Sequence, residues 1–453
     1  MRPLTRTTAT TAPAASTART ARARRILLRT EEAGASRRVK CARGIRRHCG
    51  RVAVAGAAAL CYAIPVGAAP APATTDEPGS LPAAFRQRSY APGAAAELVL
   101  WRRTPRVTLR LYRIGAKGTR RNDVLPGTPV GPPRTVRWRR VLTVAVPRRR
   151  SGLYFERLTG PGLVGYAPFV LRPARLGTSR VAVIEPTNTW QAYNFRDVDG
   201  DGVGDTWYAD PSYNGVDLTR PFLRRGVPPH FRAYDLGFLR WLARSGHRVD
   251  FLSDDDLDRL SARQLARLYD LIVFPGHEEY VTEHVWDAVE RYRDLGGNLA
   301  FLSANDFFYR VEPRGSRIYR TGRWRDVGRS ESALIGETYV GWFMNRYKNR
   351  PYAVEGGSAA AWLYRGTGLH DGDTFGSYGI EISAKDSRSP RGTVVLAEAR
   401  NLFGPGRSAQ MTYYRTRTGA QVFSAGVINF GGSAEWPAVS RMLENLWRRL
   451  SRP

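Results

Sequence analysis

Cysteine is nearly absent from this chain of 453 residues. The three cysteines lie close together in the N-terminal part, at Cys41, Cys49 and Cys61. Three thiols are too few for a disulfide framework or for a four-thiolate zinc site. The rest of the chain must be stabilised by its hydrophobic core, and a metal bound there needs oxygen or nitrogen ligands.

Acidic residues are scarce in the N-terminal part. Residues 1–51 carry fourteen Lys and Arg against two Glu, and an apolar run follows at 52–69. Small residues spaced as A-x-A begin at Ala69, which completes a pattern typical of a secretory signal. We therefore predict that residues 1–73 are a leader and that the mature protein is secreted and extracellular. An uncleaved leader would instead attach the chain to a membrane, which is the membrane contact that the sequence allows.

The formal net charge of +30 suggests an anionic partner at first sight. The fourteen basic and two acidic residues of the leader account for +12 of it, and the remaining charge is spread along the chain. We therefore expect no specific nucleic-acid partner. A homo-oligomer is compatible with the sequence.

Several catalytic signatures are also missing. The sequence contains no H-E-x-x-H motif, no G-x-S-x-G elbow and no Walker loop. A thiol nucleophile is excluded because every cysteine falls in the predicted leader.

The remaining chain divides into a linker and two domains. Residues 74–87 are the linker, and residues 88–176 consist of short β-branched and aromatic runs separated by turns, which predicts a β-sandwich. In residues 179–453 buried strand patterns alternate with helical ones before a more β-like last third. This alternation predicts an α/β domain with a doubly wound parallel sheet.

Three segments leave the carboxyl ends of predicted strands, where such sheets bind ligands. They are EPTNTWQAYN, PGHEEY and SANDFFY. In PGHEEY, alternation along an extended chain would direct His277 and Glu279 to one side and Glu278 to the other. A solvated loop, with Glu279 capping the next helix, is the competing interpretation.

Two tyrosines are expected near the same edge of the sheet, Tyr193 in NTWQAYN and Tyr234 at the start of a helix. Tyrosines are most often packed aromatics. Two phenols and a carboxylate would nevertheless form a hard, all-oxygen ligand set suited to an oxidised iron.

A separate acidic segment, RDVDGDGVGDTWY, follows Tyr193. Its aspartates stand at positions 1, 3, 5 and 9 of a calcium-loop pattern, and the carbonyl of the seventh residue is available. Position 12 is Tyr208 instead of the usual glutamate, so a solvated acidic turn is the alternative. The predicted calcium ligands are Asp197, Asp199, Asp201, Val203 and Asp205.

The chain resembles the large (β) subunit of N,N-dimethylformamidase and its C-terminal-domain homologues. The resemblance is carried by TNTWQAYN, RAYDLGFLRWL, LIVFPGHEEYVT, GGNLAFLSAN, GIEIS around Glu381 and GAQVFSAGVINF. It implies an immunoglobulin-like module followed by a domain related to class I glutamine amidotransferases.

The resemblance also implies a mononuclear iron held by Tyr193, Tyr234 and Glu279, with His277 and Asn305 as catalytic or substrate-facing residues. His277 would move a proton to the leaving amine. Glu278 stands where the family usually has Asp, and Val281 where it usually has an aromatic. These departures bear on the pocket lining and therefore on the substrate.

The sequence thus predicts a secreted, iron-dependent amidohydrolase that acts on the carbon-nitrogen bond of a small amide. The alternative is a secreted, non-catalytic protein that keeps the fold, with or without a calcium-braced loop, and binds a surface ligand.

Overall fold

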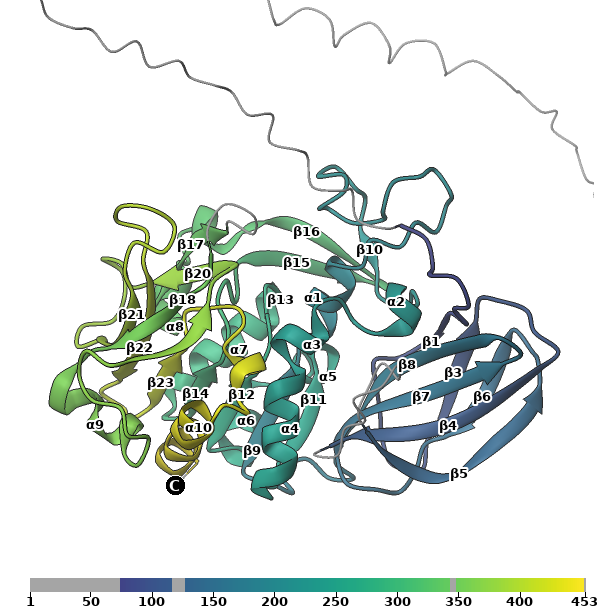
Figure 1. Cartoon of the computed structure of the whole chain (residues 1–453), viewed down its shortest axis with the longest axis horizontal. Coiled ribbons are helices and arrows are strands. Elements are labelled where there is room, and N and C mark those ends of the chain that lie inside the picture. Colours follow the sequence, from purple (N-terminus) through teal and green to yellow (C-terminus); the bar gives the residue numbers. More distant parts are fainter. Residues whose placement is uncertain (1–73, 116–126, 343–347, 452–453) are drawn as a thin grey trace, which may run out of the picture. The chain divides into compact units, whose positions relative to one another are not determined.

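The computed structural model describes residues 74–115, 127–342 and 348–451 (Figure 1). The predicted leader and its three cysteines lie outside these ranges, so the signal peptide and secretion stay predictions. Among the described residues, no helix combines the length and the apolar character needed to cross a membrane.

The N-terminal module contains two β-sheets. Strand β3 (Ala95–Leu100) alternates in burial, so that Ala96, Leu98 and Leu100 face the core. The first sheet has the order β1-β3-β6, with β1 (Ala83–Phe85), β3 (Ala95–Leu100) and β6 (Val141–Ala145). The second has the order β2-β8-β7-β4-β5, with β2 (Ser89–Tyr90), β4 (Arg106–Ile114), β5 (Gly127–Arg137), β7 (Gly152–Gly160) and β8 (Leu163–Leu171).

One apolar cluster fills the space between these two sheets. It includes Leu98 from the first sheet and Val107, Leu158 and Phe169 from the second. Two sheets with a shared apolar cluster therefore form this region, and the immunoglobulin-like β-sandwich stays a prediction.

A nine-stranded sheet forms the centre of the second region. Its order is β11-β9-β12-β14-β23-β22-β21-β18-β19, parallel from β11 to β23 and antiparallel from β23 to β19. The strands are β9 (Val181–Glu185), β11 (Asp250–Ser253), β12 (Leu271–Phe274), β14 (Asn298–Phe301), β18 (Arg350–Val354), β19 (Thr374–Tyr378), β21 (Val394–Ala399), β22 (Ala409–Arg415) and β23 (Gln421–Ser424).

Both faces of the parallel half are buried. Val181 and Val183 of β9 belong to one apolar cluster, and Ala182 and Ile184 belong to another. Helices α4 (Leu236–Ser245) and α10 (Pro437–Leu450) contribute to the first cluster, and α6 (Ala262–Leu268) and α7 (Glu283–Asp294) contribute to the second. The run of five buried residues in β9 follows from this double burial.

The predicted fold class, a doubly wound α/β domain of the class I glutamine amidotransferase type, is wrong. Strands make up 35% of the described residues and helices 22%. The strands lie in several sheets, and the parallel strands are only part of a mixed one. The alternation of strand and helix between β9 and β14 is a local feature, and antiparallel hairpins such as β21-β22-β23 build the last third.

Two small sheets and several short helices border the central sheet. One sheet has the order β10-β16-β15-β13, and β17 pairs antiparallel with β20. The strands are β10 (Val216–Asp217), β13 (Tyr280–Thr282), β15 (Tyr309–Arg314), β16 (Arg317–Arg323), β17 (Thr338–Trp342) and β20 (Glu381–Ala384). The helices are α1 (Thr187–Ala192), α2 (Leu223–Gly226), α3 (Phe231–Tyr234), α5 (Asp254–Leu257), α8 (Glu331–Ile335), α9 (Gly357–Tyr364) and the 3-10 turns η1 (Trp324–Val327) and η2 (Gly431–Ser433).

Candidate functional site

The residues that follow three neighbouring parallel strands meet at one edge of the central sheet. Strand β9 leads into α1 and Tyr193, β12 leads into His277 and Glu279, and β14 leads into Asn305. The ring centroids of Tyr193 and His277 are 5.4 Å apart. The Asn305 side chain donates a hydrogen bond to Glu279, with Nδ2 2.8 Å from Oε1.

A second carboxylate, Glu381, joins this group from the start of β20. The same Asn305 Nδ2 lies 2.9 Å from Glu381 Oε2, and the Tyr193 hydroxyl donates to Glu381 Oε1 at 3.4 Å. One amide therefore holds two buried carboxylates that approach from elements far apart in the sequence.

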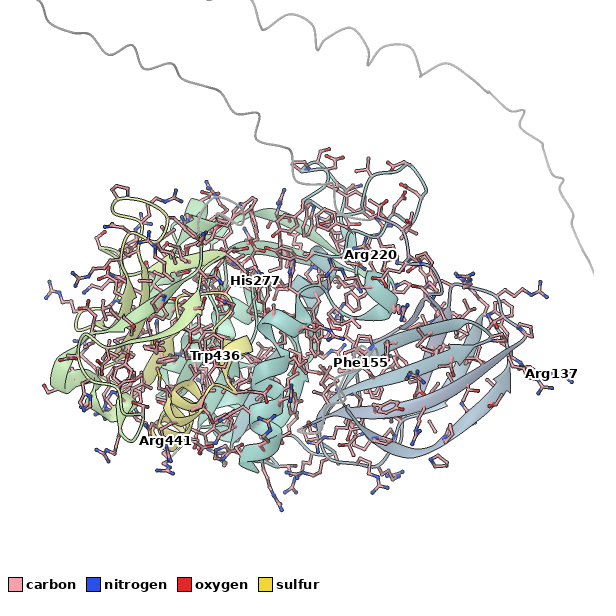
Figure 2. The ribbon with its side chains drawn as sticks, viewed as in Figure 1. Arg137, Phe155, Arg220, His277, Trp436 and Arg441 are labelled. Carbon is pink, nitrogen blue, oxygen red and sulfur yellow. The ribbon has the colours of Figure 1, made fainter. Side chains whose placement is uncertain are left out.

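His277 faces both carboxylates. Its Nε2 lies 3.8 Å from Glu279 Oε2 and 3.8 Å from Glu381 Oε2. The ring is hydrogen-bonded to the backbone of Asn305, and Nε2 is a buried atom without a partner. Figure 2 shows His277 inside the ribbon, whereas Arg137 extends outward from the N-terminal module.

Glu278 points away from this group, as the alternation along PGHEEY predicts. Its backbone N–H donates to Asp306 Oδ1 at 2.9 Å. Burial, and then the neighbouring carboxyl of Asp254, raises the pKa of Glu278 well above its usual range. The side chains of His277 and Glu279 thus face the site, and that of Glu278 faces other buried carboxyls.

Tyrosines enclose the carboxylates on a further side. The rings of Tyr193 and Tyr208 lie 4.2 Å apart, and the Tyr208 hydroxyl is 2.6 Å from Glu279 Oε2. The Tyr280 hydroxyl in turn donates to Tyr208 at 2.9 Å. A chain of phenols therefore ends on Glu279.

Tyr234, the other predicted iron ligand, is placed differently. It ends α3 within a small apolar cluster with Ala304 and Ile428, and its ring stacks on His230 with centroids 5.1 Å apart. Burial, and then the charge of Glu381, raises the pKa of Tyr234 above its usual value. Tyr234 therefore borders the site near Glu381, while Tyr193 and Tyr208 interact with Glu279.

Several residues in and beside the candidate site have strained backbone conformations. Asn305 and Phe307 adopt positive φ angles of 57° and 55°, and so does Ile380, with 72°, directly before Glu381. His230, which stacks on Tyr234, has a φ of 57°. Non-glycine residues in this conformation persist where their surroundings fix them, which occurs often at functional sites.

Burial controls the protonation of the site. It lowers the pKa of His277 to about 3, so this ring is neutral near pH 7. It raises the pKa of Glu279 to about 7, although the hydroxyl of Tyr208 acts in the opposite direction. Burial, and then the charge of Glu279, raises the pKa of Glu381 well above its usual range. A cation bound between these groups would favour their ionised forms.

The residues present fit a hard metal ion. The donor set consists of phenol and carboxylate oxygens together with the neutral His277, whose Nε2 has no partner. Asn305 Oδ1 is a second buried polar atom without a partner. Leaving such atoms unpaired costs about 1–3 kcal/mol each, so a further polar group that reached them would be stabilised.

The predicted calcium loop comes together only in part. Carboxylate oxygens of Asp197, Asp199 and Asp205 lie within 4.8 Å of one another. Asp201 is not part of this group, and its Oδ1 accepts a hydrogen bond from the backbone N–H of Val203 at 2.7 Å. Calcium binding at this loop stays a prediction.

The sequence assigned no role to three residues of the site. In the sequence pattern, Tyr208 is only the twelfth position of the acidic loop, and Glu381 is only part of the motif GIEIS. His230 had no signal in the pattern, because it is a single residue before a short helix.

Comparison with known proteins identifies the family. The family model described as N,N-dimethylformamidase beta subunit-like, C-terminal, matches residues 90–442. Two proteins named N,N-dimethylformamidase beta subunit are similar to this chain. The one from Alcaligenes sp is 24% identical over 420 residues, covering 68% of this chain and 54% of its own length. The one from Paracoccus aminophilus is 26% identical over 314 residues, covering 55% of this chain and 40% of its own length.

The chain spans about half the length of these curated relatives, or less. Among solved structures, the mmIFT52 N-terminal domain matches with a TM-score of 0.31 and 13% identity, covering 46% of this chain and 87% of that domain. A likeness at that TM-score carries no argument. The family match covers most of the chain and includes every residue of the candidate site, so the chain belongs to the N,N-dimethylformamidase beta subunit-like, C-terminal family.

Proposed function

We propose that this protein hydrolyses the carbon-nitrogen bond of a small amide. The observation that supports it most strongly is the double hydrogen bond of Asn305, whose Nδ2 lies 2.8 Å from Glu279 and 2.9 Å from Glu381. It keeps two buried carboxylates beside the neutral His277. The curated relatives are named after an amidase subunit, in agreement with this proposal.

The two carboxylates have different surroundings, which suggests different roles. Glu279 accepts hydrogen bonds from Tyr208 and Asn305 and belongs to the set proposed to hold iron, with Tyr193 and Tyr234. Bound there, a ferric ion would polarise an amide carbonyl and lower the pKa of a water molecule. Glu381 is the better candidate for moving the proton, because it lies 3.8 Å from His277 Nε2 and is held by Asn305. A cation bound beside it would favour its ionised form, which can accept a proton.

The reaction then balances with water as the second substrate. Glu381 accepts a proton from water, and the water oxygen forms a bond to the carbonyl carbon. The carbon-nitrogen bond breaks, and Glu381 returns the proton to the leaving amine. His277 Nε2, which has no other partner, accepts a hydrogen bond from the attacking water. This assignment moves the proton transfer expected of His277 to Glu381, because burial lowers the pKa of His277 to about 3 and makes its ring a weak proton acceptor.

The test uses the purified full chain, whose iron is measured by elemental analysis. Release of formate and amine is followed with N,N-dimethylformamide and N-methylformamide. We expect stoichiometric iron that is lost in Tyr193→Phe and Glu279→Ala. Iron-free protein, with a metal content that these substitutions leave unchanged, would contradict the iron-dependent reaction.

Glu381→Gln tests the proton transfer by Glu381 separately from its place in the hydrogen-bond network. It keeps the hydrogen-bonding shape of the side chain, and we expect a loss of about 10²–10⁴ in kcat because the proton acceptor is gone. Glu156→Gln is the matched control, since Glu156 is also buried but lies in β7 of the N-terminal module. Equal activity in both variants would contradict the role of Glu381. If the purified chain binds amides without hydrolysing them, the alternative of a non-catalytic binding protein is correct.

A further inference from the structure

The antiparallel ribbon of β17 and β20 provides one wall of the candidate site. Glu381 accepts from the Asn305 side chain, and Ser383 Oγ accepts from the Asn305 backbone N–H at 3.1 Å. Glu381 and Ser383 are two residues apart in a strand, so their side chains lie on the same face. That face of the ribbon is the one that contacts the site.

Strand β17 places two aromatic residues opposite them. Tyr339 pairs with Ser383, and Trp342 pairs with Glu381, because a shift of register between Tyr339 and Gly341 offsets the alternation of β17. Opposite residues of an antiparallel pair share a face, with Cβ atoms about 4.5–5.5 Å apart. Burial, and then the charges of Glu381 and Glu279, raises the pKa of Tyr339, as its position on this face requires.

Three aromatic residues of this region differ in their exposure, from a buried residue to one that is open to solvent. Phe308 is 7% exposed, and its ring contacts Tyr339 with centroids 5.2 Å apart. Trp342, at the outer end, is 58% exposed, the largest fraction among the exposed large hydrophobic residues of the described chain. The exposed Trp342 is thus the strand partner of the buried Glu381. We define the aromatic wall as Phe308, Tyr339 and Trp342.

The charge beside this wall bears on what it can bind. The Arg407 guanidinium donates to the backbone oxygen of Val340 at 3.0 Å, between Tyr339 and Trp342 in the sequence. A cationic substituent would meet this positive charge. A neutral, flat and apolar substituent would instead stack on the indole and remove apolar surface from water.

We infer that the aromatic wall, with Trp342 at its outer end, is a subsite for a neutral aryl or similarly flat apolar substituent of the amide substrate. This inference rests on the proposed amide hydrolysis and adds the substrate class. The reacting amide lies at the carboxylates, and the substituent extends along Tyr339 toward Trp342.

The experiment compares N-benzylformamide with N-methylformamide, which share the reacting group and differ by a phenyl ring. The full-length protein should show a lower KM for N-benzylformamide. Trp342→Ala should raise that KM about tenfold and leave kcat/KM for N-methylformamide within about twofold, since one aromatic contact is lost. Trp342→Phe should retain most of the preference. Trp436→Ala is the control, because Trp436 is the other exposed tryptophan of the described residues and contacts Tyr378.

Calorimetric binding of N-benzylformamide separates this inference from the hydrolysis proposal. Binding that weakens in Trp342→Ala but not in Trp436→Ala, without hydrolysis, supports the subsite and contradicts the proposed reaction. Hydrolysis of N-methylformamide with no gain from the phenyl ring, or an equal loss for both amides in Trp342→Ala, overturns the subsite and leaves the reaction standing. The absence of both binding and hydrolysis overturns both.

Discussion

The Tyr208 hydroxyl donates a hydrogen bond to Glu279, with its oxygen 2.6 Å from Oε2. Tyr208 also accepts a hydrogen bond from Tyr280. This connection ties the segment after the acidic loop to the carboxylate proposed to hold iron. It gives Tyr208 a role that its place in the sequence pattern did not suggest.

Tyr208→Phe removes this donor and keeps the ring. Hydrogen bonds to charged groups contribute about 1.5–3 kcal/mol, so we expect iron affinity or kcat to fall by about tenfold or more. Dialysis against a chelator, followed by elemental analysis, measures the first effect. Tyr280→Phe is the comparison variant and should have a smaller effect, because the Tyr280 hydroxyl bonds to Tyr208, which in turn bonds to Glu279. A larger loss in Tyr280→Phe than in Tyr208→Phe would contradict the direct role of Tyr208.

Asn305 can be tested with two substitutions that differ in backbone strain. Asn305→Asp tolerates the positive φ of 57° but places a third carboxylate between Glu279 and Glu381. Asn305→Gly relieves the strain and removes the amide. We expect both variants to lose about 100-fold or more in kcat/KM. Thermal unfolding measures how far the relieved strain in Asn305→Gly offsets the donor that Glu279 and Glu381 lose. If the loss of activity in the two variants instead parallels their loss of stability, Asn305 has only a structural role.

Local patterns in the sequence predicted single features of the fold, and long-range contacts account for what they missed. A threonine directly before a helical pattern favours an N-cap, and the Thr282 side chain accepts from the Val285 N–H at the start of α7. The opposite directions of Glu278 and Glu279 followed from strand alternation. Glu381 is separated from Asn305 by 76 residues, and no period in the sequence records that contact. The predicted fold class is wrong for a related reason. The alternation of strands and helices between β9 and β14 does not indicate how later hairpins extend the same sheet.

Arg220 connects α1 to the acidic loop without contacting the site. Its guanidinium is buried and donates to the backbone oxygens of Gln191, Arg196, Asp205 and Asp217. Lysine keeps the charge but lacks the fork of donors, so we expect Arg220→Lys to lower the free energy of unfolding by about 2–4 kcal/mol. Denaturant titration measures this loss. Arg137→Lys, at an exposed position of β5, should change stability little, and equal effects of the two substitutions would contradict the bracing role of Arg220.

Glu156 gives the N-terminal module a pH-dependent stability. It is 3% exposed in β7, and burial raises its pKa from 4.5 to about 8. The folded state therefore binds this proton more tightly than the unfolded state. Stability from this group is complete below about pH 4.5 and falls by about 1.4 kcal/mol per pH unit as the pH rises toward 8.

Glu156→Gln keeps the neutral shape and should remove this dependence. We expect its thermal midpoint to exceed that of the parent by a margin that grows from pH 5 to pH 8 and then levels off, because above the folded pKa both states of the parent are ionised. Glu97→Gln is the control, since Glu97 is exposed and pairs with Arg86 at the surface, where an ion pair contributes little. A margin for Glu156→Gln that stays constant across this pH range would mean that Glu156 is ionised in the folded protein.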